Sequence, residues 1–324
     1  MIVVAAQGDT LFSMQVHRAL PRYKVPGGLA LTVGTFDGVH RGHQLLAQTL
    51  HDEARMRGLQ SAALTFNDMP YCFFAPDACP KLLSLADEKI EVFARQTPLD
   101  HLFIVPFSRE LADTSARDFL ERWVRKANLK LFIGGPDFAL GRGREGTIPQ
   151  LAELGRELGF EARGLDAKLA EADLPISSTR ARAVVERGEV ERARAFLGRP
   201  YRMSGRVVSG DQIGRTIGAP TINLQIQERK CLPKNGVYAI RARFDDSSDW
   251  KNAALNMGMR PTVGGLKKQI EFHVLDEHIE TAPTSVEVEF VARLRDERKF
   301  AALDELRVQM SRDFEAARAV LSGE

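Results

Sequence analysis

The sequence predicts an α/β domain followed by a β domain, and three observations carry this prediction. Short apolar runs alternate with amphipathic helical patterns between residues 29 and 166, which is typical of a mostly parallel sheet covered on both faces. After residue 201, short alternating strands separated by turn residues take over, which favours a small β-barrel or sandwich. The last segment, 302–321, is predicted as a helix that completes a small β-barrel domain.

Each predicted element follows from its own pattern. In the segment 43–58 the apolar residues Leu46, Leu50 and Ala54 recur every four positions with charged residues between them, which indicates an amphipathic helix. In the first domain, the same reasoning predicts strands at 29–33, 61–66, 101–107, 129–135 and 160–166 and helices at 43–58 and 116–127. It predicts two short helices within 176–198, broken at Gly188. The later strands are predicted at 202–211, 236–244, 269–276 and 285–295.

The change of pattern near Gly198 predicts two domains, 1–198 and 199–324. A chain of 324 residues is long enough to bury a core in each. We expect the first 28 residues to supply an edge strand and a linker.

Composition limits the class of partner. Lys and Arg total 45 against 43 Asp and Glu, a net charge of +2, so no strong field attracts nucleic acid or an anionic membrane. No run reaches the roughly 20 apolar residues that a membrane helix needs, and the N-terminal segment lacks the basic flank of a signal peptide. We therefore expect a cytoplasmic protein with small-molecule partners, and its self-association is left open.

The three cysteines are Cys72, Cys79 and Cys231. Their spacing matches neither a zinc knuckle nor a Cys-x-x-Cys redox pair. We expect all three to be reduced and to pack as small hydrophobic residues.

The segment GTFDGVHRGH, residues 34–43, joins the first predicted strand to the first predicted helix. At such a turn, free backbone N–H groups and the helix dipole point at a bound anion, so α/β folds hold phosphates there. Gly34 and Gly38 allow the backbone to approach closely, and His40 and His43 share a face of the first helical turn. The segment therefore predicts a site for the phosphates of a nucleotide.

Two other interpretations of these histidines are weaker. A zinc helix places its histidines four residues apart with a glutamate beside the first, whereas here Arg41 follows His40. Two histidines in a glycine-rich turn are also poor core residues. The segment is neither a dinucleotide fingerprint nor a Walker loop, because it lacks Gly-x-Gly-x-x-Gly and the chain contains no Gly-Lys pair.

The segment ISSTR, residues 176–180, places three hydroxyls ahead of a predicted helix. Ser177, Ser178 and Thr179 are good helix caps, and the same hydroxyls and N–H groups can bind phosphate. Both interpretations can hold together, and Arg180 adds a fixed positive charge.

The predicted β domain contains a second polar constellation. Residues 205–224 predict a strand, a glycine-rich loop and another strand. Thr221 and Asn223 lie two apart in an extended segment, so both oxygens point to one face, as a Mg²⁺ or phosphate site needs. Farther on, Glu271 shares a strand face with Gln269, a pattern that alone favours a solvated face over a catalytic carboxylate.

These motifs together carry a family resemblance. Residues Gly34, Phe36, Asp37, His40, Gly42 and His43 resemble the His-x-Gly-His signature of the nucleotidyltransferase superfamily, and ISSTR resembles its second nucleotide-binding motif. The segments GRVVSGDQIGR, PTIN, GVYA, MRPT and IEFHVLD follow one another as in bacterial riboflavin kinases. In this order they make the chain similar to the bifunctional riboflavin kinase/FAD synthetases, from about Leu29 onward.

The resemblance implies two ATP-dependent reactions on flavins. It implies a Rossmann-like nucleotidyltransferase domain that adenylylates FMN with release of pyrophosphate, and a riboflavin kinase barrel that makes the FMN. It implies that His40, His43 and Arg180 stabilise charge in the first reaction, that Glu271 activates the riboflavin hydroxyl, and that Mg²⁺ is held at Thr221 and Asn223. The implied ligand contacts are Gly34, Phe36, Asp37, Gly42, Asp137, Phe138, Ser177, Ser178, Thr179, Gly205, Gly210, Asp211, Gly214, Arg215 and Arg260.

The chain departs from the family pattern around its substrate loops. FNDMP, residues 66–70, keeps only the last proline of Phe-x-Pro-x-Pro, residues 139–141 replace the usual Phe-Gly, and the Tyr-Gly expected after HVLD is missing. Separately from these departures, two alternatives stay open: a single-activity nucleotidyltransferase with a ligand-binding barrel, and a non-catalytic flavin-binding protein. The presence of both polar constellations weighs against each.

Overall fold

The computed structural model describes residues 2–4, 14–165, 170–171, 174–209, 220–245, 247–262, 265–277, 279 and 281–323. The chain divides into two compact units, 1–178 and 179–324. The two short helices predicted within 176–198 group mostly with the second unit. The boundary at Gly198 stays a prediction for the two functional domains.

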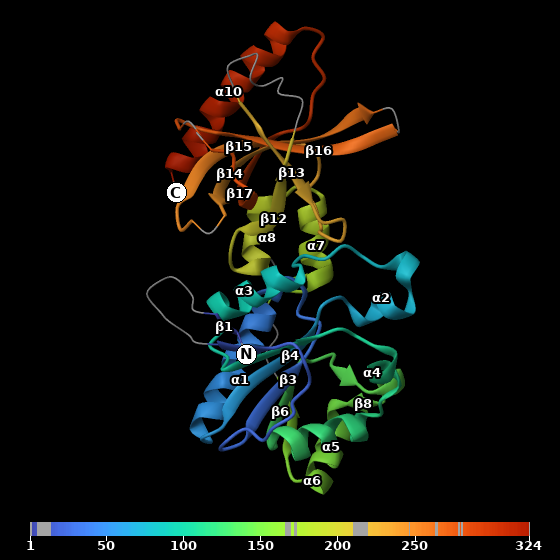
Figure 1. The fold of residues 1–324 in the computed structure, drawn as a ribbon. Coiled ribbons are helices and arrows are strands. Elements are labelled where there is room, and N and C mark those ends of the chain that lie inside the picture. Colours follow the sequence, from blue (N-terminus) through green and yellow to red (C-terminus); the bar gives the residue numbers. More distant parts are fainter. Residues whose placement is uncertain are drawn as a thin grey trace. The chain divides into compact units, whose positions relative to one another are not determined.

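The first unit is built on a seven-stranded sheet (Figure 1). The strands lie in the order β1 (Ile2–Val4), β2 (Met14–His17), β5 (His101–Val105), β4 (Gln60–Phe66), β3 (Leu29–Val33), β6 (Leu129–Gly134) and β9 (Glu161–Gly164). All pairings from β2 to β9 are parallel, and β1 pairs antiparallel with β2 at the edge. The predicted parallel sheet is therefore confirmed.

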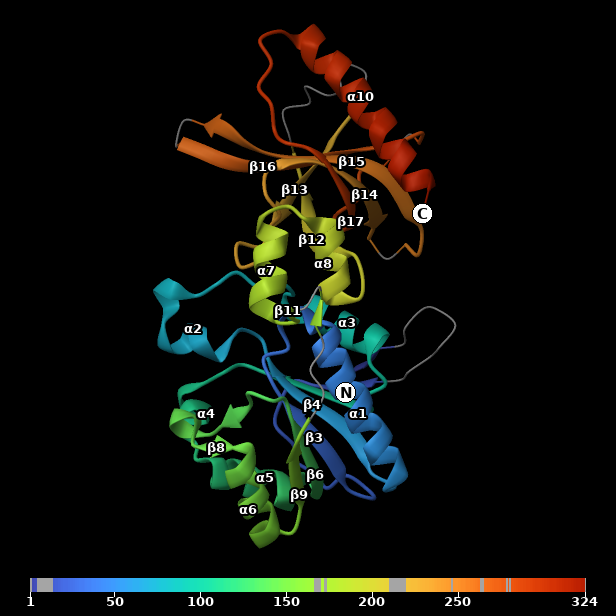
Figure 2. The same cartoon turned by 180° about the vertical axis from the view of Figure 1, so that it is seen from behind.

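Helices cover both faces of this sheet (Figure 2). They are α1 (Arg41–Met56) and α3 (Ala86–Gln96) on one face, and α5 (Ala116–Ala127) and α6 (Ile148–Leu158) on the other. The alternation of side chains along β3 explains the two cores, because Ala30 packs toward α1 and α3 while Leu29 and Leu31 pack toward α5 and α6.

Shorter elements connect the strands of the first unit. They are η1 (Asp37–Val39) after β3, α2 (Pro70–Phe74) and η2 (Pro76–Ala78) after β4, α4 (Arg109–Asp113) after β5, and η3 (Arg142–Arg144) within the hairpin of β7 (Ala139–Leu140) and β8 (Gly146–Thr147). A second short hairpin pairs β10 (Ala170–Glu171) with β11 (Leu174–Pro175). Because the strands are parallel, the elements that follow β3, β4, β5 and β6 leave from one edge of the sheet.

The second unit is a closed antiparallel barrel. Its order is β12 (Tyr201–Val208), β13 (Ile222–Ile226), β16 (Gly265–Val274), β15 (Trp250–Thr262), β14 (Gly236–Phe244) and β17 (Ser285–Arg295). The helices α7 (Ser178–Glu186) and α8 (Val190–Leu197) precede it, and α10 (Leu303–Ser322) follows it. Ala317 and Leu321 of α10 pack on Ala239, Ala254 and Val291, so the predicted barrel with a terminal helix is confirmed.

The cysteine prediction is wrong for two of the three residues. Cys72 and Cys79 form a disulfide, because α2 and η2 fold the chain back and bring their Cα atoms to 4.8 Å. Sequence spacing alone could not foresee this turn. Cys231 is fully buried in the second unit, as expected for a small hydrophobic residue.

None of the helices in the described part of the chain is long and apolar enough to cross a bilayer.

Candidate functional site

The strand order creates a switch point beside β3. The chain places β4 and β5 on one side of β3 and then crosses over to form β6 and β9 on the other side. In open α/β sheets, ligands bind outside the carboxyl ends of the strands at such a point. Residues 34–40 follow β3 and residues 135–138 follow β6, so both predicted ligand segments of this sheet border the switch point.

A tightly folded turn joins β3 to α1. Gly38 has a φ of 76° and Val39 has a φ of 39°, a left-handed conformation that a β-branched residue rarely adopts. A side chain at Gly34 would place its Cβ 3.0 Å from Cζ of Phe36, so glycine there lets this ring lie close against the backbone. Backbone strain of this kind is found mostly at functional sites, where the surrounding structure maintains it.

His40 and His43 lie against each other where α1 begins. Nδ1 of His40 accepts a hydrogen bond from the backbone N–H of His43 at 3.3 Å and so caps the helix. The two rings stack with centroids 3.5 Å apart and planes inclined by 16°. A Cβ at Gly42 would lie 3.2 Å from Cε1 of His40, so glycine leaves room for the stacked ring. The two histidine side chains therefore lie in contact at the N-terminus of α1. Their action on phosphates stays a prediction.

The surroundings of His43 disfavour its charged form. Burial lowers its pKa well below the usual value, and the neighbouring His40 and Lys89 lower it further. Its Nδ1 atom is buried and has no hydrogen-bond partner among the described residues. A neutral imidazole at a helix N-terminus, beside a buried cation, is suited to receive an anionic group.

Sequence reasoning missed Lys89, whose side chain is fully buried behind this turn. Its Nζ donates to the carbonyl oxygens of Thr35 at 2.9 Å and of Phe66 at 2.8 Å. Burial lowers the pKa of Lys89 to about 8, against the opposing influence of Asp37 and Asp68. One side chain thus ties the turn after β3 to the end of β4.

Asp37 and Phe36, both predicted to contact ligand, have buried structural contacts. The Asp37 carboxylate accepts hydrogen bonds from the backbone N–H groups of residues 83 and 84, each at 3.1 Å, and its carbonyl accepts one from Ser178 Oγ at 2.8 Å. The ring of Phe36 packs edge-on against Phe93 with centroids 5.4 Å apart. These contacts shape the turn, and a direct contact with the nucleotide stays a prediction for both residues.

The ISSTR segment meets this turn through Ser178, the first residue of α7. Ser177 directly precedes the helix, as a residue near a phosphate or a cap would. Thr179 and Arg180 begin the second unit, so their approach to His40 and His43 stays a prediction.

The loop after β6 is anchored by its aromatic residue. Phe138 packs against Phe132 with centroids 5.3 Å apart. A Cβ at Gly134 would lie 2.6 Å from Cδ1 of Ile148, so a larger residue where the loop leaves the strand would make that side chain move. Asp137 is exposed, and its carbonyl oxygen accepts a hydrogen bond from Arg144 at 3.0 Å. Contacts of Asp137 and Phe138 with a ligand stay predictions.

A second polar cluster lies on neighbouring strands of the barrel. β13 and β16 pair with Asn223 opposite Glu271. Thr221 Oγ1 donates to Glu271 Oε2 at 3.2 Å, and Gln269 Nε2 lies 3.3 Å from Asn223 Oδ1. The structure thus brings Thr221, Asn223 and Glu271 together, as the strand alternation predicted for their orientation.

Asn256 completes this cluster and was missed from the sequence. It lies on β15, opposite Glu271, with its Nδ2 atom 3.5 Å from Glu271 Oε1. The strand itself was not predicted, because Gly258 and Pro261 interrupt its apolar pattern. His273 Nδ1 lies 2.8 Å from the carbonyl oxygen of Pro220 and so holds the segment that leads to Thr221.

The barrel cluster has the donor set of a magnesium site. Mg²⁺ prefers oxygen ligands, and the cluster offers the Thr221 hydroxyl, the Asn223 amide oxygen and the Glu271 carboxylate. The described residues also bring together Asp68, Cys72 and Cys79, with one ligand atom of each within 4.8 Å of the others. Sulfur atoms are poor ligands for Mg²⁺, so that group does not fit the predicted metal.

The remaining predicted contacts of the barrel are Gly205, Arg260 and four residues of its glycine-rich segment. Gly205 lies in β12, where a Cβ would come within 2.5 Å of Cδ1 of Ile226. Arg260 lies in β15. The predicted residues Gly210, Asp211, Gly214 and Arg215 lie outside the described residues.

Fold and sites together define a class of protein. An α/β unit with a turn at its switch point that is predicted to bind phosphate, joined to a barrel with a carboxylate beside a hydroxyl, is the arrangement expected of a two-site nucleotide-dependent transferase. A model of the FAD synthetase family matches residues 23–180, and a model of the riboflavin kinase family matches residues 197–321.

Relatives match nearly the whole chain. The bifunctional riboflavin kinase/FMN adenylyltransferase of Escherichia coli K12 is 37% identical over 292 residues, covering 90% of this chain and 92% of the relative. The enzymes of the same name from Haemophilus influenzae and Bacillus subtilis are 35% and 32% identical, covering 94% and 89% of this chain and 99% and 90% of the relatives. The chain belongs to the bifunctional riboflavin kinase/FMN adenylyltransferase family.

A solved structure agrees with this fold. A crystal structure from Streptococcus pneumoniae, described as a macrolide-efflux protein, is 28% identical and matches with a TM-score of 0.82, covering 91% of this chain and 95% of that chain. The likeness supports the fold, and efflux is the description of that protein.

Proposed function

We propose that the barrel cluster performs the riboflavin kinase reaction and that the turn before α1 performs the FMN adenylyltransferase reaction. The chain is an enzyme of the bifunctional family, with riboflavin, FMN and ATP as substrates. One observation carries the assignment within the barrel. Glu271 lies within hydrogen-bond distance of Thr221 and opposite Asn223, so a base and two oxygen ligands meet at one place.

In the kinase reaction, Glu271 accepts the proton of the riboflavin 5′-hydroxyl while that oxygen attacks the γ-phosphorus of ATP. The new oxygen–phosphorus bond gives FMN, and the bond to the bridging oxygen breaks so that ADP leaves. Thr221, whose hydroxyl donates to Glu271, orients the carboxylate. The proposed nucleotide contacts around it are Gly205, Gly210, Asp211, Gly214, Arg215 and Arg260.

We propose Thr221 and Asn223 as the residues that hold Mg²⁺, because their oxygens fit its ligand preference. When bound, Mg²⁺ neutralises charge on the ATP phosphates. Asn256 and Gln269 keep the carboxylate and the Asn223 amide in place through their own hydrogen bonds.

In the adenylyltransferase reaction, a phosphate oxygen of FMN attacks the α-phosphorus of a second ATP, and pyrophosphate leaves as the bridging bond breaks. His40, His43 and Arg180 stabilise the charge that develops on the phosphates. The start of α1 and residues 177–179 supply N–H groups and hydroxyls to the triphosphate. Asp137 and Phe138, beside the switch point, contact the flavin or the adenine nucleotide.

Both reactions consume ATP, which supports a cytoplasmic location for the enzyme.

The test is to incubate the purified chain with riboflavin, ATP and Mg²⁺ and to separate the flavins. His43→Ala is expected to accumulate FMN with FAD formation reduced at least about a hundredfold. Glu271→Gln is expected to lose FMN formation to a similar degree and still to convert supplied FMN into FAD. His51→Ala is the matched control, because His51 lies on the same helix and hydrogen-bonds to Ser61 away from the turn.

Mixing the two variants is expected to restore FAD, since each supplies the step that the other lacks. If the unmodified chain converted supplied FMN into FAD but made no FMN from riboflavin, it would be a single-activity nucleotidyltransferase. Binding of FMN without either product would indicate a non-catalytic flavin-binding protein. If each variant lost both steps while folded, the division between the two sites would be wrong.

A further inference from the structure

The segment 67–82, here called the flap, is tied at both ends to the turn that contains the histidines. At its start, the carbonyl oxygen of Phe66 accepts a hydrogen bond from Lys89, which also binds this turn through Thr35. At its end, the backbone N–H groups of residues 83 and 84 donate to Asp37 in the same turn. The residues that flank the flap are therefore anchored to the turn of the proposed adenylylation site.

The middle of the flap presents aromatic side chains. Tyr71 is 56% exposed and Phe74 is 64% exposed. Phe73 packs against Phe107 with centroids 5.6 Å apart, and Phe107 packs against Phe66 at 5.4 Å. These rings connect the flap to the carboxyl ends of β4 and β5, beside which a flat aromatic ligand would bind.

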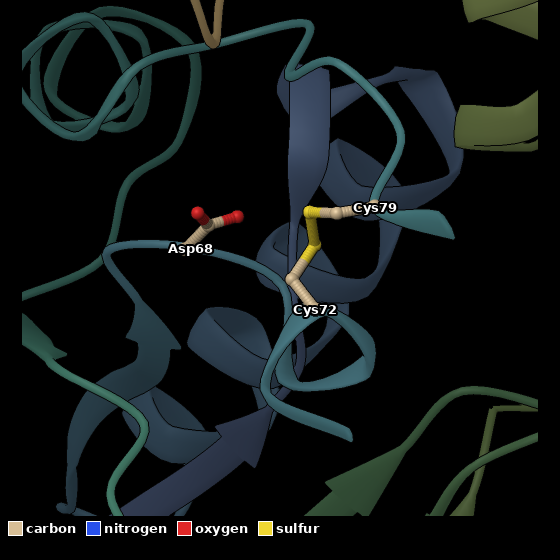
Figure 3. A group of neighbouring side chains, drawn as sticks. All are labelled: Asp68, Cys72 and Cys79. Atoms are coloured by element: carbon tan, nitrogen blue, oxygen red, sulfur yellow. A yellow bond between two sulfur atoms is a disulfide. The ribbon is translucent and has the colours of Figure 1, made fainter. Parts of the chain in front are cut away.

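A disulfide closes this part of the flap into a ring (Figure 3). Cys72 and Cys79 enclose Phe73 and Phe74, and their Cα separation of 4.8 Å lies within the range that a disulfide spans without backbone movement. Both cysteines are half-buried, so small thiols and disulfides can reach them. The carboxylate of Asp68 lies within 4.8 Å of both sulfur atoms.

We propose that Cys72 and Cys79 are a reversible thiol–disulfide site that controls the order of the flap and thereby the affinity of the adenylylation site for FMN. The proposal rests on the proposed placement of that reaction at the turn before α1. Disulfides in cytoplasmic proteins are usually transient rather than structural, so the proposed cytoplasmic location favours a reversible Cys72–Cys79 disulfide. The negative charge of Asp68 opposes a thiolate beside it and so favours the uncharged disulfide.

The oxidation step uses a small-molecule disulfide such as glutathione disulfide. One cysteine thiolate attacks a sulfur of this disulfide, forms a mixed disulfide and releases one thiol. The second cysteine then attacks the protein sulfur of the mixed disulfide and releases the other thiol. Two protein thiols are oxidised, one disulfide is reduced, and the two protons pass to the departing thiolates.

The closed ring removes freedom from the flap. A flap that is ordered before binding loses less conformational entropy when FMN binds, so the oxidised enzyme binds FMN more tightly. Freeing one or two side chains corresponds to a change in affinity of about three- to tenfold. The kinase reaction belongs to the other unit and serves as an internal reference in the same sample.

The test treats the whole enzyme with glutathione disulfide or with dithiothreitol and then alkylates the thiols. Trypsin releases residues 58–81 as one peptide that contains both cysteines and no internal Lys or Arg, so mass spectrometry assigns its redox state directly. The KM for FMN in FAD formation is expected to be about three- to tenfold lower in the oxidised enzyme. Riboflavin phosphorylation is expected to be equal in both states.

Cys79→Ser is expected to behave as the reduced enzyme under both treatments. Cys231→Ala is the matched control, because that cysteine is buried in the barrel, and it should keep the full response. Full alkylation of both flap cysteines after oxidation, or a KM for FMN that is equal or higher in the oxidised enzyme, overturns the proposal.

A metal site is the competing outcome, because Zn²⁺ accepts two cysteines and an aspartate as ligands. Protection of both thiols by stoichiometric Zn²⁺, together with resistance to oxidation by glutathione disulfide, would replace the redox site by a metal site. If the adenylylation reaction is placed wrongly, His43→Ala will not reduce FAD formation, and the alkylation of the cysteines will be the same as in the unmodified chain. A failure of the proposed function is therefore distinguishable from a failure of the redox proposal.

Discussion

The Nζ atom of Lys89 lies 2.8 Å from the carbonyl oxygen of Phe66 and 2.9 Å from that of Thr35. Phe66 ends β4, and Thr35 is the second residue after β3, so one buried side chain sets the spacing of two strand ends. Thr65 Oγ1 donates to the same Thr35 oxygen at 2.9 Å. These hydrogen bonds hold the turn before α1 against the end of β4.

Lys89→Met is expected to lower the free energy of unfolding of the first unit by about 2 kcal/mol, because two buried carbonyl oxygens lose a charged donor. FAD formation from supplied FMN should fall about tenfold or more, since the turn loses its support. Trp123 is fully buried in the first unit, and the second of the two tryptophans, Trp250, lies in the barrel. In a Trp250→Phe background, the tryptophan fluorescence followed during urea unfolding therefore comes from Trp123 and reports on the first unit alone.

Lys126→Met is the matched control, because Lys126 is exposed on α5. It should leave stability within about 0.5 kcal/mol and leave both activities unchanged. Equal stability and equal FAD formation in Lys89→Met would show that Lys89 does not support the turn.

The sequence predicted the fold wherever the hydrophobic pattern was strict. The buried runs at 29–33 and 101–107 correspond to β3 and β5, because strands buried on both faces contain continuous apolar residues. β15 was missed because Gly258 and Pro261 are poor strand residues, and in the barrel its neighbours override that local preference.

The candidate sites were predictable only where spacing decides orientation. Thr221 and Asn223 are two apart in a strand, and the pairing of that strand with β16 then brings Glu271 opposite Asn223. Lys89 gave no such signal, because a lysine in a helix is normally exposed. The Cys72–Cys79 pair depends on how α2 and η2 turn, which no spacing rule specifies.

Asn256 is expected to act as a positioning residue for Glu271, from which it lies 3.5 Å away between Nδ2 and Oε1. Asn256→Ala should lower kcat of riboflavin phosphorylation about tenfold, with a smaller change in KM for ATP, because one hydrogen bond to the carboxylate is lost. Conversion of supplied FMN into FAD should not change. Steady-state kinetics of both reactions separate these effects.

Asn252→Ala is the control for this variant, since Asn252 lies four residues earlier on the same strand and is exposed. Loss of kcat to the same degree in both variants would indicate damage to β15 rather than to the position of Glu271.

Gly141 supports the loop after β6 by its lack of a side chain. Its φ is 81°, and a Cβ would lie 2.6 Å from the backbone nitrogen of Ala116. Gly141→Ala should therefore destabilise the first unit by about 3 kcal/mol, from backbone strain and from a steric clash. Gly159 has a φ of 82°, and a Cβ there meets no described atom within 4 Å, so Gly159→Ala should cost about 1 kcal/mol. Equal losses in the two variants would contradict a role for the clash.

The half-buried His17 and the buried His101 form a hydrogen-bonded pair of imidazoles. His17 Nε2 lies 3.1 Å from His101 Nδ1, and His101 Nε2 lies 2.5 Å from Gln60 Oε1. The Gln60 oxygen can only accept, so His101 donates through Nε2 and receives the N–H of His17 on Nδ1. A second proton on His101 would set two donors against each other.

Acid is therefore expected to destabilise the first unit through this pair. Burial and the neighbouring His101 lower the pKa of His17 to about 4, and burial lowers the pKa of His101, against the influence of Asp100. The pKa of His17 is 6.5 in the unfolded chain and about 4 in the folded chain, so between these values the unfolded chain binds more protons. The contribution of neutral His17 to stability is therefore present above about pH 6.5 and is lost as the pH falls toward 4. Because the His17 ring is partly exposed, we expect the loss from it to be about 1 kcal/mol.

His17→Gln removes the titrating ring and keeps an N–H donor toward His101, so it should flatten the fall in stability over this window. Urea unfolding at several pH values, followed through Trp123 in the Trp250→Phe background, measures the slope. His51→Gln, on α1, is the control and should retain the slope of the unmodified chain. An unchanged slope in His17→Gln would show that other groups, among them His43 with its lowered pKa, account for the acid sensitivity.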